Sequence, residues 1–156
     1  MIEADEFMKS SQQFEAGEPA KPVDIEYLRT AWDRWNEFGK SHPNTSLGAA
    51  VMGLDDGNHS AEQAHAAWVR LMLLNAMMER GVLSRYVTGG KPSAELFAAA
   101  ATMPCTKEDL AEAMIQRTLK AASPEAAAQS KIEMQAGGYD PEHPMIDSKF
   151  LEWVKK

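Results

Sequence analysis

Apolar residues recur at spacings of three and four along most of the chain, which is the pattern of amphipathic α-helices. The clearest stripe begins just after Asp24 and consists of Ile25, Leu28, Trp32, Trp35 and Phe38. No run of alternating β-branched residues, the usual mark of strands, appears. We therefore predict an all-α fold: an irregular bundle of six to seven helices around a central apolar helix at about residues 60–80.

Start and stop signals define that central helix. Ser60 and Gln63 form a capping-box sequence at its start, and Gly81 ends it. Between Ala64 and Met78 the helix is apolar on nearly all sides, so we expect other helices to surround it. The preceding segment, residues 41–59, is rich in glycine and turn-forming residues and is predicted to be irregular.

Similar signals divide the second half of the chain. An alanine-rich helix is predicted over Ser93–Met103, and the next helix begins at a cap made by Thr106 and Asp109. Pro124 suits the first turn of a further helix, where its missing N–H costs nothing. Asp147 is expected to cap a short final helix.

The charge is unevenly distributed. The chain carries a net charge of −7, and residues 1–26 hold seven acidic residues against two lysines. We predict an acidic N-terminal arm and linker over residues 1–22, followed by one helical domain over 23–156. Glu3, Asp5 and Glu6 are candidate contacts for a basic partner protein. Clustered Lys and Arg residues are missing, so no direct binding to nucleic acid is expected.

Cysteine usage and hydropathy suggest where the protein works. Cys105 is the only cysteine, which excludes an intramolecular disulfide and favours a reducing compartment. The acidic start of the chain is unlike a secretory signal, and no apolar run approaches the ~20 residues of a membrane-spanning helix. We expect a soluble, cytoplasmic protein that does not bind membranes.

The best candidate for a metal site is Glu62 with His65, because Glu-x-x-His places a carboxylate and an imidazole on one helix face. His59 lies nearby in the sequence. Di-iron bundles use two such motifs, whereas the only echo here is the proline-containing run that ends at His143. The favoured interpretation is that Glu62 stabilises the helix start and that His65 is a partly buried polar residue, so no cofactor is predicted.

Other features allow two interpretations each. The Asp55–His59 run resembles a turn more than a calcium loop. Cys105 precedes a predicted helix start, yet nothing in the sequence links it to a catalytic base. The methionines of residues 72–78 would either fill the core or line a groove for a partner helix. Tyr27 falls off the apolar face of its helix and is the better candidate for a surface contact.

Three functional hypotheses follow. The leading one is a non-enzymatic helical module for protein–protein interaction, an adaptor, regulator, inhibitor or assembly subunit that binds a partner or a second copy of itself. The alternative is a small metal- or ligand-binding bundle, or a small enzyme, that uses Glu62 and His65. A further alternative is an acidic mimic that occupies the basic groove of nucleic-acid-binding machinery.

Overall fold

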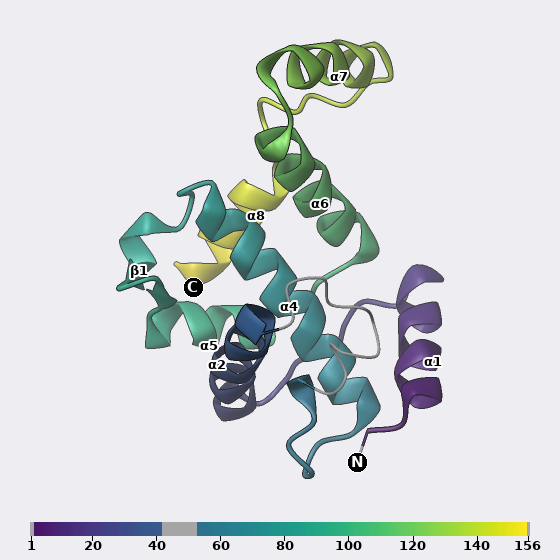
Figure 1. Ribbon diagram of the computed structural model, residues 1–156, viewed down its shortest axis with the longest axis vertical. Helices are drawn as coiled ribbons and strands as arrows, with labels where there is room; N and C mark the ends of the chain where they lie inside the picture. The colour runs from purple at the N-terminus through teal and green to yellow at the C-terminus, as the bar shows by residue number, and fades with distance from the viewer. Residues whose placement is uncertain (1, 42–52, 156) are drawn as a thin grey trace.

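The computed structural model describes residues 2–41 and 53–155. Most of the segment predicted to be irregular, residues 42–52, lies outside the described residues. The predicted all-α class is confirmed, with seven α-helices in the described part of the chain (Figure 1). They are α1 (Ala4–Glu15), α2 (Ile25–Ser41), α4 (Ala61–Glu79), α5 (Ala94–Thr102), α6 (Lys107–Ala121), α7 (Pro124–Ala136) and α8 (Met145–Val154).

A small hairpin joins α4 to α5. After a 3-10 turn, η1 (Ser84–Tyr86), the strands β1 (Val87–Thr88) and β2 (Lys91–Pro92) pair in antiparallel fashion. Gly89 and Gly90 form the turn between them, with φ values of 62° and 76° that glycine adopts without strain.

The predicted caps at the starts of α4 and α6 are confirmed. Ser60 Oγ accepts the backbone N–H of Gln63, and Gln63 Oε1 accepts the N–H of Ser60. Thr106 and Asp109 make the same reciprocal pair. Each capping box satisfies two N–H groups that a helix start leaves without partners.

The predicted cap at Asp147 is wrong, because α8 begins at Met145. Asp147 lies in the first turn, and its carboxylate accepts two hydrogen bonds from Arg80, at 2.9 and 2.7 Å. The N–H of Ile146 donates instead to Glu112 of α6, at 2.6 Å. A residue distant in sequence therefore replaces the local cap.

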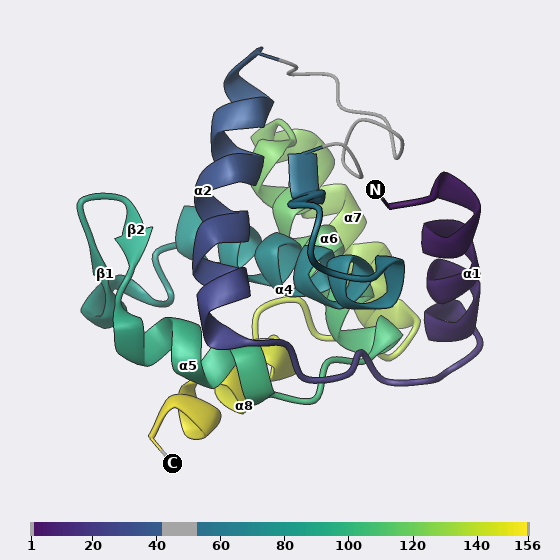
Figure 2. The ribbon, with the colours of Figure 1, turned by 90° about the horizontal axis from the view of Figure 1, so that it is seen from below.

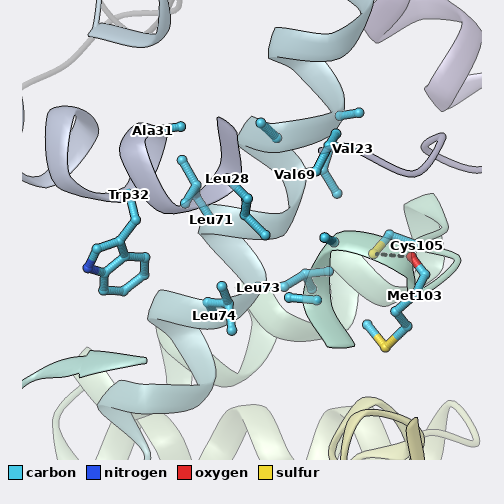
Figure 3. Packing of buried hydrophobic residues seen from close by; sticks show 14 of the residues in the cluster. Val23, Leu28, Ala31, Trp32, Val69, Leu71, Leu73, Leu74, Met103 and Cys105 are labelled. Atoms are coloured by element: carbon cyan, nitrogen blue, oxygen red, sulfur yellow. Dashed lines mark hydrogen bonds between the residues drawn. The ribbon is translucent and has the colours of Figure 1, made fainter. Parts of the chain in front are cut away.

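Helix α4 packs against α1, α2, α5 and α6. Apolar residues on all sides of α4 are buried, so each neighbouring helix packs against an apolar surface of α4 (Figure 3). Met77 is fully buried, so this methionine fills the core. The buried residues of α4 are Ala64, His65, Ala66, Ala67, Val69, Arg70, Leu71, Leu73, Leu74, Ala76 and Met77.

Arg70 is the one charged side chain among those buried residues, with 1% of its surface exposed. Its guanidinium donates to four backbone carbonyls: Ala100 at 2.8 Å, Met103 at 2.9 Å, Ala66 at 3.1 Å and Ala20 at 3.3 Å. Burial lowers the pKa of Arg70. The four acceptors belong to three separate segments, so this side chain connects α4, the end of α5 and the segment after α1.

The segment after α1 is also fixed by backbone hydrogen bonds. Ala20 N–H donates to Cys105 at 2.8 Å, and Val23 N–H donates to Ala101 at 3.0 Å. Helix α1, from the stretch predicted to be an acidic arm, packs along the N-terminal half of α4 (Figures 1 and 2). The division of the chain at residue 22 stays a prediction.

Helix α7 lies at one end of the long axis of the molecule (Figure 1). It packs against α6, and none of its side chains is buried. In the described part of the chain, no helix is long and apolar enough to cross a bilayer.

We predict that Arg70→Met lowers the free energy of unfolding by about 3 kcal/mol or more, because buried carbonyls lose their donors. Arg29 of α2 is exposed, and Arg29→Met should change stability by no more than about 0.5 kcal/mol. Urea unfolding followed by circular dichroism measures both. A loss below about 1 kcal/mol for Arg70→Met would show that its hydrogen bonds are dispensable.

Candidate functional site

Candidate residues from the start of the chain and from residues 59–62 lie close together, between α1 and the start of α4. A cleft of about 390 Å³ lies between α1 and the turn that leads into α4, and Glu3, Glu6, His59 and Glu62 all line it. The sequence indicated them as two groups, Glu3 with Glu6 as partner contacts and His59 with Glu62 as weak metal candidates, without any signal that the two groups lie together. Folding brings them together because Phe7 and Phe14 fix α1 against α4.

The contact between α1 and α4 is aromatic. The centre of the His65 ring is 5.2 Å from the centre of the Phe7 ring and 5.5 Å from that of Phe14, and both pairs are edge to face. Trp68, one turn further along α4, also contacts Phe7, at 6.1 Å. Such edge-to-face pairs stabilise packing beyond the apolar area that they bury. His65 is therefore a core residue, with 3% of its surface exposed.

His65 also has an unsatisfied polar atom. Its Nε2 is buried and has no hydrogen-bond partner among the described residues. Burial lowers the pKa of His65 to about 4, so the ring is neutral near pH 7. A neutral imidazole has one donor and one acceptor nitrogen. Whether Nε2 carries the proton or not, a hydrogen-bond partner would therefore stabilise it.

A second, smaller cavity lies beside the cleft. It measures about 40 Å³ and is lined by Ser10, Gln13 and Glu62, which also line the cleft, together with Phe14 and His65. Lys21 lies at its edge, where its ammonium group is 2.8 Å from a carboxylate oxygen of Glu62. This ion pair raises the pKa of Lys21.

His59 is held in one orientation at the rim of the cleft. Its Nδ1 is 2.6 Å from a carboxylate oxygen of Asp56, and its ring stacks on Tyr27 at 3.8 Å. Asp55 accepts the N–H groups of Gly57 and Ile2, which lower its pKa. The Asp55–His59 run is thus a hydrogen-bonded turn that also binds the N-terminal residues.

The expectation that Tyr27 is a surface contact is wrong, because only 3% of its surface is exposed. Its hydroxyl donates to the carbonyl of Leu54 at 3.2 Å. The apolar periodicity shows only which residues of α2 share a face. Burial of Tyr27 comes from another segment, the turn before α4, which covers its ring. Ile25, which was placed on the apolar face, is in fact exposed.

The acidic candidates Glu3, Asp5 and Glu6 are exposed at the start of α1, where Glu3 is the residue before the helix. No ion pair of theirs occurs within the described residues. Two of them, Glu3 and Glu6, line the cleft. Their role as contacts for a partner protein stays a prediction.

The Glu62–His65 pair does not gather further ligands in the part of the chain that the structure describes. No group of three or more His, Cys, Asp and Glu side chains suited to a metal ion occurs there. Glu62 faces Lys21, and His65 faces aromatic rings. His143 pairs with Asp140 at 2.7 Å.

Cys105 is fully buried, and its thiol donates to the carbonyl of Met103 at 3.3 Å (Figure 3). Burial raises the pKa of Cys105 to about 11. The group is therefore a thiol at neutral pH, and its chemistry is that of a small core residue.

No protein-family model, curated protein or solved structure matches this chain. The residues themselves carry the functional argument.

We predict that His65 makes stability depend on pH. Its pKa is lower in the folded protein, so the unfolded chain binds more protons between about pH 6.5 and pH 4. The free energy of unfolding should fall as pH decreases through this range, and His65→Phe should reduce that slope. Urea unfolding at a series of pH values measures it.

The matched control is His143→Phe, which removes an imidazole whose pair with Asp140 is exposed. It should change the slope far less than His65→Phe does, because exposed ion pairs contribute little to stability. Equal slopes for the wild type and His65→Phe would contradict the account, since carboxylates alone would then explain the acid sensitivity.

Proposed function

We propose that this protein is a non-enzymatic helical interaction module of the cytoplasm and that α7 is its contact element. The supporting observation is that α7 buries none of its 13 residues' side chains. Ile132 in this helix is 61% exposed. An isolated helix of this length is marginal in water and gains most of its stability from packing.

The two sides of α7 differ. Its partly buried residues, Ala127, Ser130, Lys131 and Met134, follow helical spacing and form the inner side. The outer side presents Ile132 with Ala128 and Ala136 one turn away in either direction, all exposed. Small side chains beside one larger apolar group allow a second helix to approach closely.

The position of Met77 changes where the contact is expected. A methionine groove on α4 was one possible docking surface, but Met77 is fully buried and Met72 and Met78 are only partly exposed. The proposal therefore places the contact on α7, and a second copy of the chain is the simplest partner. A pair of symmetry-related α7 helices would bury Ile132 in both copies.

A second candidate function rests on the acidic surface of α1. Glu3, Asp5 and Glu6 are exposed and could dock on a basic protein surface, including the groove of nucleic-acid-binding machinery. Binding of that kind would weaken steeply as salt is added, whereas an apolar α7 contact would change little.

We predict that Ile132→Glu weakens self-association at least tenfold, because it places a carboxylate in an apolar contact. Sedimentation velocity of the full chain over a wide concentration range measures this. Ala126→Glu is the matched control: it makes the same charge change on α7, about 120° away around the helix. It should associate like the wild type.

Two results together would refute the proposal. One is a wild-type chain that stays monomeric at every concentration. The other is that no protein recovered with it depends on Ile132 for capture.

A further inference from the structure

We propose that proton binding to His65 releases α1 from α4 while the remaining helices stay packed. This inference does not depend on the role of α7. It goes beyond the effect of His65 on the stability of the whole protein, because it names the element that opens first. It rests on the few contacts that hold α1 and on the buried nitrogen that has no partner.

Helix α1 is attached to the rest of the molecule through few buried groups. Two of its twelve residues, Phe7 and Phe14, have buried side chains, and both rings pack edge to face on His65. Among the helices, α1 packs mainly against α4 (Figures 1 and 2). An isolated helix of this length is marginal in water, so α1 depends on this contact. The ring that both phenylalanines contact is an imidazole, which can take up a proton.

The closed contact has no place for a protonated imidazole. Such a ring donates from both nitrogens, whereas Nε2 of His65 is buried and has no partner among the described residues. The rings that surround it, Phe7, Phe14 and Trp68, supply no oxygen or nitrogen acceptor at these contacts. Burying a charge without a partner is costly. Proton binding therefore favours a state in which water reaches the ring, and the removal of α1 provides it.

Charged groups near His65 do not supply a counter-ion. Glu62 of α4 and Glu18 and Lys21 of the segment after α1 line the small cavity that His65 also lines, and Glu62 is 2.8 Å from Lys21. From α1, the polar residues in this lining are Ser10 and Gln13, which are uncharged. Burial alone lowers the pKa of His65, so none of these charges offsets it. The charged side chains of α1 itself are all exposed: Asp5, Glu6, Lys9 and Glu15.

Two polar contacts hold the ends of α1 independently of His65. The N–H of Ile2 donates to Asp55 at 2.8 Å, and Lys107 of α6 donates to the carbonyl of Glu15 at 2.9 Å. Hydrogen bonds lower the pKa of Asp55, so this carboxylate stays charged while His65 titrates. The pH dependence of release is therefore assigned to His65, and variants of two other histidines test this assignment.

The chain after α1 allows the helix to move without the body. The carbonyl of Ala20 accepts from Arg70 at 3.3 Å, and its N–H donates to Cys105 at 2.8 Å. Between this anchor and α1 lies the exposed Gly17, with a φ of 111°. Glycine changes its backbone conformation at less cost than other residues do. Release of α1 can therefore end at Gly17 and leave the hydrogen bonds of Ala20 intact.

The size of the effect follows from the two pKa values of His65. Its pKa is about 4 when α1 is packed and returns to the ordinary 6.5 when water reaches the ring. The packed state is therefore fully favoured above pH 6.5 and loses that advantage as the pH falls towards 4. The equilibrium constant for release should rise about 30-fold between pH 7.5 and pH 5.

The test is hydrogen–deuterium exchange of the full chain at pH 7.5, 6 and 5, corrected for the chemical exchange rate at each pH. The opening constant of α1 amides should rise about 30-fold over this range. It should also exceed that of α5 amides at every pH, because a helix with many buried residues opens only with the body.

Three variants assign the effect to one ring. His65→Phe keeps an aromatic side chain but cannot bind a proton, so α1 opening should no longer change between pH 7.5 and pH 5. His143→Phe, which replaces a side chain that is 84% exposed, should behave like the wild type. His59→Phe should also behave like the wild type, because His59 stacks on Tyr27 of α2 and not on α1.

Four results would overturn the proposal. They are equal opening constants for α1 and α5 at every pH, an α1 opening constant that does not change with pH in the wild type, a pH dependence that survives in His65→Phe, and one that is lost in His59→Phe. Circular dichroism at pH 7.5 checks that each variant is folded. Titration of the His65 ring by NMR in the wild-type chain needs no variant, and a pKa of 6.5 with α1 still protected would equally contradict the proposal.

Discussion

The fold depends on one buried cation. Arg70 donates to four carbonyls, and two of them, Ala100 and Met103, lie at the C-terminal end of α5. Carbonyls at a helix end lack partners within the helix and carry partial negative charge, so a guanidinium satisfies both needs at once. The desolvation of Arg70 is offset only while every segment that supplies an acceptor stays in place. This makes the arrangement of these segments cooperative.

The candidate site is a consequence of that arrangement. Arg70 also binds the carbonyl of Ala20. The N–H of Val23 donates to Ala101 at the end of α5, and the N–H of Ala20 donates to Cys105 in the connection that follows. The chain before Ala20 must therefore run along α4, where Phe7 and Phe14 pack on His65. The cleft is what remains between α1 and the turn into α4 beyond these aromatic contacts. The aromatic contact of Phe7 and Phe14 with His65 thus brings the glutamates of the cleft together.

Local signals in the sequence were sufficient for the helices and for two of their caps, because the capping boxes at Ser60 and Thr106 involve residues only three positions apart. Burial of Tyr27 and the role of Asp147 were not predictable, since their partners come from distant segments. Arg70 gave no signal at all: an arginine in an apolar helix could equally have extended to solvent. Its partners are backbone carbonyls, which any sequence supplies.

The structure thus has two parts: helices packed around α4, and α7, which lies at one end of the molecule and has no buried side chain. Stability should be distributed in the same way, because a segment with few buried contacts opens with a small free energy. Hydrogen–deuterium exchange of the isolated, dilute protein tests this most directly. The account predicts slow exchange of α4 amides around Arg70, fast exchange of α7 amides, and protection of α7 as the protein concentration rises. Protection of α7 equal to that of α4 in the dilute monomer would contradict it.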